Sequence, residues 1–518
     1  MSIYGFTSRC NLQPNSYPFK QRDIVRTSMF SKYDLKPTSS QNDTIMAETP
    51  ERQVPHITYM ENVMPVAEGV ISVGYQQLVS FNNDLASTTR VIELRDDAGR
   101  RKYLLHAGSK LYVTDAKTLT LWTELTLPTE LATLTGDTFI SQGYVEGVTY
   151  LYASNIGAFK IALDTNAVSM VTFTALEADK ILGIVATAGY LIAYSTSALY
   201  WGSVDNFLDF TPDIEVGADS QIPSDLKGNI VAVYPLPQGG LIYTDKNVVG
   251  FGATSNLRNP WLFREVPGSS GISAPEEVAY DDNMADHVVW STSGLSQLNR
   301  LEHKLIHPEA SQFLAGRLID GALQSNGIPQ EITLSAAMKV RTNIVGSRYL
   351  IISYGQSIPF QFALVYDQAL RRWGKLNVAH SDVFELSSPT DSTGTATRNI
   401  AFIQPSGRVV MLNMDETYAE REGVIQIGPV AVTNEKTTRF YGATVVAGRF
   451  HSTVKLGISV SYDGTTKENI KWAYELAYGS RLSREYLLLL EGVNVTLTIK
   501  GTFKLTDVLI NLDGGGER

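Results

Sequence analysis

The chain has a single cysteine, Cys10, in 518 residues. It therefore forms no internal disulfide and no cysteine-based zinc cluster, and this cysteine content fits a reducing compartment. Charged residues are also scarce, at 19% against about 25% in typical proteins. Lys and Arg number 43 and Asp and Glu 53, a net charge of −10. Proteins that coat nucleic acid concentrate Lys and Arg against the phosphates, so this balance disfavours that class but permits DNA to pass without binding.

The sequence has little that could cross a membrane. The 24 residues between Lys180 and Asp205 carry no charge, a length that could span a bilayer. This stretch also contains Gly183, Gly189 and several Tyr, Ser and Thr residues, which make it too polar for a stable membrane helix. We expect two buried strands that meet at Gly189 and no membrane insertion. The first residues lack a basic patch followed by an apolar core, so we expect no signal peptide.

Motifs that would indicate catalysis, a cofactor or a metal are missing. There is no phosphate-binding G-x-x-x-x-G-K-[ST] loop and no G-x-S-x-G nucleophile elbow. His303 and His307 have the spacing of two zinc ligands on a helix, but Lys304 stands where a metalloprotease needs a general-base Glu. An acidic stretch lacks EF-hand spacing, so we expect a solvated loop; it contains Asp205, Asp209, Asp213, Glu215 and Asp219. We therefore expect a protein that is not an enzyme and that binds no cofactor or metal.

An internal repeat carries the prediction of the fold. After residue 68, runs of four to seven Val, Ile, Thr, Tyr and Phe residues alternate with Gly, Asn, Asp and Ser, as in short strands. Two such strands joined by a small polar turn recur, starting at Tyr103, Tyr150, Tyr190, Gly240, His287, Tyr349 and Asn399. The mean spacing of these starts is about 49 residues, and propeller blades run about 40 to 50 residues. We expect an all-β chain with a β-propeller of about seven blades, within six to eight, in which the repeat is the inner hairpin of each blade. A large irregular β-sandwich is the alternative.

The composition divides the chain into three parts. Residues 1–68 hold six prolines and many aromatic residues without lasting helical periodicity, which indicates an extended N-terminal arm ordered by its contacts with a neighbouring subunit or partner. Residues 69–424 contain the repeat and form the expected propeller. Residues 425–518 fit the repeat poorly but alternate like strands around an Asp463-Gly464 hairpin turn. We expect a C-terminal β-sandwich-like module there; the last blade together with an edge sheet is the alternative.

Two short stretches of the sequence carry recognisable motifs. Their residues are Asn62, Met64, Pro65, Gly69, Gly74 and Tyr75 in the first and Tyr200, Trp201, Ser203, Asn206, Phe207 and Phe210 in the second. The first is similar to an E-N-M-x-P run followed by G and V-G-Y, and the second to a Y-W-S element followed by F-t-p, although Gly202 intervenes before the serine here. With these motifs the chain resembles the short-tail nozzle proteins of podophages, also described as tail tubular protein B-like or packaged-DNA stabilisation proteins.

The resemblance implies a virion structural protein. Members of that family form a six-fold ring of propeller subunits around the DNA exit channel, which retains the packaged genome and lets it pass at infection. It further implies a homohexamer that contacts the portal–adaptor complex and tail fibres, spikes or a needle. The protein would be assembled in the host cytoplasm and located in the virion tail. Copy number follows from the resemblance alone.

Two other functions stay open. A receptor- or carbohydrate-binding propeller at the tail tip would expose aromatic residues such as Trp201, Trp261 or Trp290 on one face. A propeller hydrolase or lyase would need several acidic, Arg or His side chains that converge at the axis. The sequence singles out no such set.

Overall fold

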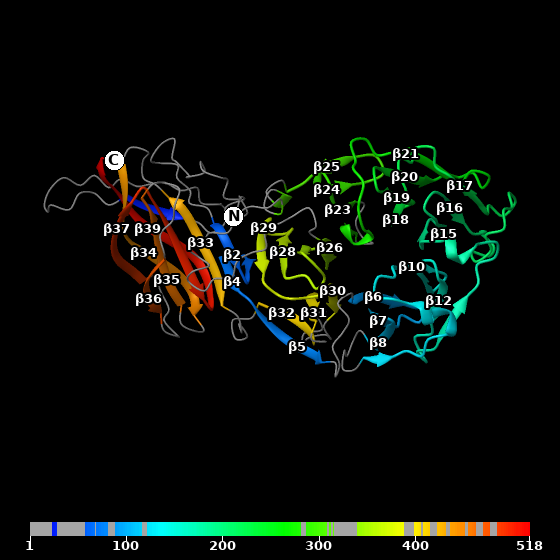
Figure 1. Ribbon diagram of the computed structural model, residues 1–518, viewed down its shortest axis with the longest axis horizontal. Coiled ribbons are helices and arrows are strands. Elements are labelled where there is room, and N and C mark those ends of the chain that lie inside the picture. Colours follow the sequence, from blue (N-terminus) through cyan, green and yellow to red (C-terminus); the bar gives the residue numbers. More distant parts are fainter. Residues whose placement is uncertain are drawn as a thin grey trace.

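The computed structural model consists of strands joined by short turns, arranged as a ring of blades with a second β lobe beside it (Figure 1). No helix in the described part of the chain is long and apolar enough to cross a membrane. The residues that the structure describes are 23–27, 57–67, 69–80, 89–115, 122–280, 286–307, 310–311, 314, 339–387, 398–405, 408–414, 422–430, 436–450, 454–462, 470–476 and 484–517.

Within these residues, seven antiparallel groups of four strands succeed one another as the blades of a propeller; six are separate four-stranded sheets, and the sixth blade is part of a ten-stranded sheet. Blade 1 contains β6 (Thr89–Arg95), β7 (Arg101–Ala107), β8 (Lys110–Asp115) and β9 (Thr123–Glu124). Blade 2 contains β10 (Ile140–Val145), β11 (Val148–Ala153), β12 (Gly157–Ile161) and β13 (Val168–Val171). Blade 3 contains β14 (Gly183–Thr187), β15 (Tyr190–Tyr194), β16 (Leu199–Trp201) and β17 (Asp219–Gln221). The 3-10 helices η1 (Thr129–Thr133) and η2 (Ala178–Lys180) lie between blades, as does η3 (Pro275–Glu277) further along the chain.

Blades 4 to 6 repeat the same order. Blade 4 contains β18 (Ile230–Leu236), β19 (Gly239–Thr244), β20 (Val248–Ala253) and β21 (Trp261–Glu265). Blade 5 contains β22 (Val278–Ala279), β23 (His287–Ser291), β24 (Gly294–Leu298) and β25 (His303–Leu305). Blade 6 contains β26 (Lys339–Val345), β27 (Tyr349–Gly355), β28 (Phe362–Asp367) and β29 (Arg372–Leu376). The first strand of each blade lies nearest the axis, where β10 contacts β14, β14 contacts β18, and β26 contacts β30 of blade 7.

Blade 7 closes the ring with a strand from before blade 1. It contains β30 (Asp382–Ser387), β31 (Arg398–Ile403), β32 (Arg408–Asn413) and, outermost, β5 (Gly74–Ser80). The antiparallel pairing of β32 with β5 runs from Arg408↔Ser80 to Asn413↔Gly74. At the axis β30 also contacts β6 of blade 1, so the ring is complete on both its inner and its outer side.

The apolar core is divided among the gaps between blades. Leu104 and Leu151 meet between blades 1 and 2, and comparable clusters fill the gaps up to blade 7. A last cluster, which includes Leu105 of blade 1 and Ile403 of blade 7, joins these two blades. Because each middle strand is covered on both faces, it reads as a nearly continuous apolar run; β15 and β27 are buried along their whole length.

The structure confirms the predicted all-β propeller and gives it seven blades. Each repeat start falls in the second strand of a blade, namely β7, β11, β15, β19, β23, β27 and β31. The prediction that the repeat is the inner hairpin is wrong, because the repeat is formed by the second and third strands and the first strand lines the axis. The uncharged stretch after Lys180 forms β14 and β15, which pair up to Thr187↔Tyr190 around a turn at Gly189, as predicted.

The second lobe is a sandwich of two sheets. One sheet has the order β2 (Ile57–Glu61), β33 (Gly423–Val430), β38 (Asn494–Gly501), β35 (Val454–Ser461) and β36 (Lys471–Leu476). The other has the order β3 (Val63–Val66), β4 (Gly69–Ser72), β39 (Phe503–Glu517), β34 (Lys436–Phe450) and β37 (Arg484–Gly492), with β1 (Asp23–Thr27) paired to β39. Through the pairing of Lys375 with Val63, this second sheet is continuous with blade 6.

The sandwich therefore includes residues that the sequence analysis placed in the arm. Residues 57–66 form β2 and β3, and the side chains of Val63 and Met64 are buried. Their apolar character explains the difference, because these strands supply core to both sheets of the sandwich. Of the remaining arm, only β1 falls within the described residues, so the predicted extended conformation of residues 1–56 lies otherwise outside them.

Three histidines among the described residues are buried: His106, His287 and His380. The ring of His287 donates from Nε2 to the carbonyl of Pro235 at 2.9 Å and accepts at Nδ1 from the Tyr243 hydroxyl at 2.8 Å. It thus connects blades 4 and 5 as a neutral imidazole. Burial lowers the pKa of each of the three histidines to about 4.

Replacement of Tyr75 by Ala tests the closure of the ring. Tyr75 on β5 is buried and packs edge-on against Phe402 of β31. We expect the free energy of unfolding to fall by about 3–5 kcal/mol, because a large aromatic group leaves a cavity at the closing blade. Denaturant titration measures it. Gln76→Ala on the same strand, at an exposed position, is the matched control, and an equal loss in the two variants would contradict the closing role.

The buried histidines predict acid sensitivity. Because their folded pKa of about 4 lies below the ordinary value of about 6.5, their stabilising effect is complete above pH 6.5 and is lost as the pH falls toward 4. For each histidine, protonation of the unfolded chain should lower the free energy of unfolding by up to about 2 kcal/mol between pH 6.5 and pH 5. Denaturant unfolding at several pH values measures the slope. The slope should be shallower in His287→Gln, and an unchanged slope would exclude His287 as a contributor.

Candidate functional site at the propeller axis

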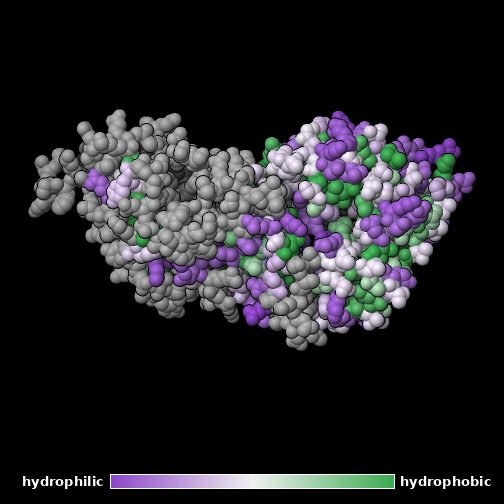
Figure 2. Space-filling model, in the orientation of Figure 1, coloured by the Kyte–Doolittle hydropathy of each residue, from purple (hydrophilic) through white to green (hydrophobic). Residues whose placement is uncertain are grey.

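A cavity of about 250 Å³ lies where the first strands of the blades converge, and its wall contains both polar and apolar residues. Every blade contributes to the wall, with Arg90, Gln142, Val185, Tyr234, Val278, Arg341 and Asp382 representing blades 1 to 7 in order. Hydrophilic and hydrophobic residues are likewise interspersed over the face of the propeller seen in Figure 2. At the axis, charged groups from distant parts of the sequence meet.

Asp382 joins three blades at this cavity. Its Oδ1 accepts a hydrogen bond from Arg341 Nη1 of blade 6 at 2.9 Å, and its Oδ2 accepts from the backbone N–H of Val91 in blade 1 at 2.8 Å. Arg341 Nη1 also donates to the carbonyl of Ser381 at 2.7 Å. The side chains of Arg341 and Asp382 are only 4% and 8% exposed. In such surroundings, charges are stable only when paired and hydrogen-bonded.

A second ion pair crosses the cavity. Arg90 of blade 1 contacts Glu276 in η3, just before blade 5. Burial lowers the pKa of Arg90 to about 10, and the positive charge of Arg341 contributes to this decrease. The negative charge of Asp382 raises the pKa of Arg90 and so offsets part of the decrease. Arg90 consequently stays protonated near neutral pH. Both Arg90 and Arg341 line the cavity, so two guanidinium groups share this small space.

The chemistry of these residues is electrostatic. Glu276 and Asp382 are both ion-paired, and Glu93 at the more exposed end of the cavity pairs with Arg95 and Arg101. Among the residues that the structure describes, no group of three or more His, Cys, Asp and Glu side chains could hold a metal ion. The site can thus join blades and bind charged or polar groups.

The first group of family-like residues lies where the chain passes from the sandwich into the propeller. Asn62 has a left-handed backbone with φ of 50° and accepts at Oδ1 from the backbone N–H of Asn377 at 2.9 Å. Its carbonyl accepts from the N–H of Val73 at 3.0 Å. The other members of this group are buried; they are Met64, Pro65, Gly69, Gly74 and Tyr75. Their role in the structure is to fix this crossing.

The second group forms the outer part of blade 3. Trp201 Nε1 donates to the carbonyl of Gly217 at 2.7 Å, and Ser203 Oγ accepts from the N–H of Asp205 at 3.1 Å and Asn206 at 3.4 Å. The remaining members pack against the interface of blades 2 and 3; they are Tyr200, Phe207 and Phe210. The two groups belong to different clusters, so the structure does not bring them together.

Gly202 departs from the family pattern for a steric reason. A Cβ at this position would lie 2.2 Å from the carbonyl oxygen of Phe207. Any side chain would therefore push the loop away from β16. The glycine lets the loop with Asn206 and Phe207 fold back onto the blade.

The other residues considered from the sequence are placed apart from the axis. His303 contacts Ser296 Oγ at 2.9 Å, whereas the ring of His307 packs 4.1 Å from that of Tyr366. In the acidic loop, Asp209 and Asp213 accept bonds from backbone N–H groups two residues ahead. These contacts are those of ordinary turns and packing, and they form no shared ligand set.

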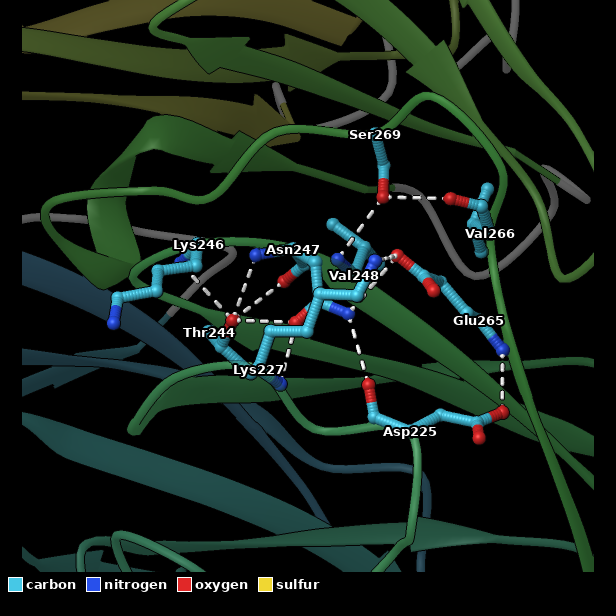
Figure 3. Close-up of polar contacts among 9 residues, drawn as sticks. All are labelled: Asp225, Lys227, Thr244, Lys246, Asn247, Val248, Glu265, Val266 and Ser269. Carbon is cyan, nitrogen blue, oxygen red and sulfur yellow. Dashed lines mark hydrogen bonds and ion pairs between the residues drawn. The ribbon is translucent and has the colours of Figure 1, made fainter.

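A second polar cluster lies at the end of blade 4 (Figure 3). Lys227 pairs with Glu265 Oε1 at 2.5 Å, and Asn247 Nδ2 donates to the carbonyl of Asp225 at 3.0 Å. The N–H of Glu265 donates to Asp225 Oδ2 at 3.0 Å, and the Thr244 hydroxyl donates to Asn247 Oδ1 at 2.9 Å. The partners are all members of the cluster, so it fixes the loop before β18 onto the end of β19 and β21.

Sequence reasoning missed the axial residues because they are far apart in the chain. Arg90, Arg341 and Asp382 come from blades 1, 6 and 7 and Glu276 from η3 before blade 5, and only the arrangement of the blades brings them to one axis. One signal was present. Arg341 lies in a strand with the sequence KVRTNIV, and a charge within a strand expected to be buried indicates a partner.

The comparisons with known proteins concern the fold. No protein-family model matches the sequence, and no curated protein matches it. The chain is similar to the solved WD40 β-propeller domain of Doa1, with a TM-score of 0.37 and 8% identity over 67% of this chain and 99% of that one. The N-terminal domain of Nup159 has a TM-score of 0.34 and 10% identity over 68% and 98%. Saccharomyces cerevisiae Sqt1 has a TM-score of 0.31 and 9% identity over 62% and 82%. The seven-bladed propeller itself is defined by the strand pairing.

Replacement of Asp382 by Asn tests the axial ion pair. The variant should lose about 3–5 kcal/mol of unfolding free energy, because it leaves the buried Arg341 without its counter-charge. Denaturant titration measures the loss. The matched control is Glu124→Gln, which removes one partner of the exposed pair with Lys110 and should change stability little. A small effect in Asp382→Asn would show that the axis tolerates an unpaired guanidinium.

Proposed function

We propose that this chain is a non-enzymatic structural subunit of a ring-shaped virion tail nozzle, which encloses the DNA exit channel, retains the packaged genome and lets it pass at infection. The proposal rests on the resemblance in residues 62–75 and 200–212 to the podophage nozzle family. Both stretches contribute residues to the described core, Met64 and Tyr75 from the first and Phe210 from the second. Their residues thus maintain the architecture, as expected for a structural family.

The observation that carries the proposal is the continuity between the two lobes. Blade 6 and one sheet of the sandwich form a single ten-stranded sheet. One apolar cluster includes Leu295 of blade 5, Trp373 of blade 6, and Ile425 and Leu497 of the sandwich. A shared sheet and a shared core resist bending between the lobes. Such a two-lobed body suits a wall that must hold its shape under the pressure of a packaged genome.

The axis supports a route for DNA between subunits instead of through each propeller. The cavity of about 250 Å³ is crossed by the Arg90–Glu276 pair and bordered by Arg341–Asp382, which leaves no room for a nucleic-acid strand. In a ring of such subunits the channel would lie at the centre of the ring. The net charge of −10 favours a wall that repels phosphates.

Assembly would follow from head-to-tail contacts between identical subunits, which close into a ring when the rotation fits. The proposed state is a homohexamer in contact with the portal–adaptor complex and with tail fibres, spikes or a needle. The location is the virion tail, reached after assembly in the host cytoplasm. An arm strand can join a sheet edge by backbone hydrogen bonds. Within this chain, β1 already pairs with β39 of the sandwich in this way.

The receptor- or carbohydrate-binding alternative has less support from the aromatic residues first considered for it. Trp201 and Trp261 are 2% and 1% exposed, and their rings pack against each other at 6.4 Å. Trp290 is partly buried against the core shared with the sandwich. A sugar-binding surface needs aromatic faces open to solvent, so these three residues do not provide one.

Electron microscopy of the purified full chain tests the proposal. We expect rings with an open central channel when the portal–adaptor complex is added, and the number of subunits follows from class averages. A parallel sample without that complex measures self-assembly. Solitary two-lobed particles in both samples would overturn the nozzle assignment.

Deletion of residues 1–55 is expected to weaken assembly. The propeller and sandwich strands from β2 onward remain, so the truncated chain should keep its β-type circular dichroism and a cooperative thermal transition. The fraction of rings, measured by mass photometry, should fall several-fold. A chain without residues 1–22, which keeps β1, is the comparison. If the longer deletion assembles as well as the full chain, the arm does not connect subunits.

A further inference from the structure

The axial cavity contains hydrogen-bonding groups that the two ion pairs leave unused. Arg341 engages Asp382 and the Ser381 carbonyl through Nη1 alone. Its Nε and Nη2 are buried and have no hydrogen-bond partner among the described residues. These two nitrogens lie on one edge of the planar guanidinium, where their N–H groups are parallel. That edge has the geometry that binds a carboxylate or phosphate in a bidentate manner.

Other unused groups line the same cavity. Arg90 Nε is a further buried donor without a partner in the described part of the chain. Gln142 Oε1 and Asn343 Oδ1 are buried acceptors in the same condition. Buried polar groups are almost always hydrogen-bonded, and leaving them unbonded destabilises a fold. The residues of the wall thus include donors from the two arginines and acceptors from the two amides.

We propose that the axial cavity binds a small carboxylate that also carries hydroxyl groups, such as a hydroxy acid. The carboxylate accepts from Nε and Nη2 of Arg341, with Arg90 Nε as an additional donor. Hydroxyl groups of the ligand donate to Gln142 Oε1 and Asn343 Oδ1. The volume of about 250 Å³ accommodates several non-hydrogen atoms, since one water occupies about 30 Å³ in the liquid.

The charges around the cavity fit an anion of this size. Arg90 and Arg341 are close enough for the positive charge of Arg341 to lower the pKa of Arg90. A carboxylate on the arginine side reduces this repulsion. The facing acids are already neutralised, because Glu276 and Asp382 are ion-paired. Glu93 lies in the wall with its own partners Arg95 and Arg101, which limits its repulsion of a bound anion. This site is independent of the nozzle assignment.

Calorimetric titration of the full chain with sodium glycerate tests the proposal. Sodium propionate is the matched ligand, because it has the same carboxylate and three-carbon chain without the two hydroxyl groups. Ionic strength is kept constant with sodium chloride. We expect saturable binding of glycerate at one site per chain, with an apparent Kd at least fivefold lower than that of propionate. Heats no larger than those of added chloride would overturn the proposal and leave ordered water as the partner of these groups.

Two variants locate the binding. Gln142→Glu is nearly isosteric and places a negative charge in the wall without removing either arginine. Arg341→Lys keeps the charge but loses the paired N–H edge. Each should raise the apparent Kd for glycerate at least tenfold, whereas the surface variant Glu124→Gln should bind as the unmodified chain does. Equal affinity in Gln142→Glu and the unmodified chain would place the binding elsewhere. Binding of sodium phosphate with none of glycerate would overturn the carboxylate assignment.

If Arg341→Lys unfolds, Gln142→Glu alone decides the outcome. Its fold is checked first by the thermal transition without ligand, which we expect to shift by only a few degrees. A folded Gln142→Glu protein with unchanged glycerate affinity contradicts the proposal.

Discussion

The structure depends on the closure of a ring by a strand that precedes it in the sequence. Each blade buries its faces against two neighbours, so an open ring would expose two apolar faces to water. The pairing of β5 with β32 prevents this at the outer side of blade 7. At the axis, Asp382 performs the same task by joining Arg341 of blade 6 and Val91 of blade 1. The propeller is thus closed by a backbone pairing at the outer side of blade 7 and by a charged hydrogen-bond network at the axis.

Closure also explains why the two lobes form one body. The segment that leads into β5 first passes through β2, β3 and β4 of the sandwich. Asn62 is held there in a left-handed conformation by its contacts with Asn377 and Val73, and Lys375 of blade 6 pairs with Val63. Displacement of the sandwich would therefore pull on the strand that completes the propeller. Stiffness between the lobes follows from this path of the chain.

The sequence was sufficient for the propeller because its repeat is a local pattern. Tyr190-Leu-Ile-Ala-Tyr and Tyr349-Leu-Ile-Ile-Ser are apolar runs that mark the second strand of a blade, and their spacing sets the number of blades. The membership of β2 and β3 in the sandwich could not be read in this way. The partner of β2 lies more than 300 residues away, and the hairpin of β3 and β4 joins the rest of its sheet through the equally distant β39. The axial site is non-local for the same reason. Arg341 signals a buried partner, but nothing near it in the sequence identifies Asp382 or the distant Arg90.

The position of β39 has a consequence for the order in which the protein folds. β39 lies between β4 and β34 in its sheet, and Ser72 exchanges hydrogen bonds with Phe503 at a sequence separation of 431 residues. During synthesis, β3 and β4 therefore emerge long before the strand that pairs with them. Until β39 is synthesised, the edge of β4 with which it pairs has no partner from β39. Such long-range pairing slows folding and leaves strands unpaired in the meantime. The sandwich is therefore completed only after β39 has been synthesised, and its unpaired strands are exposed to misassembly until then.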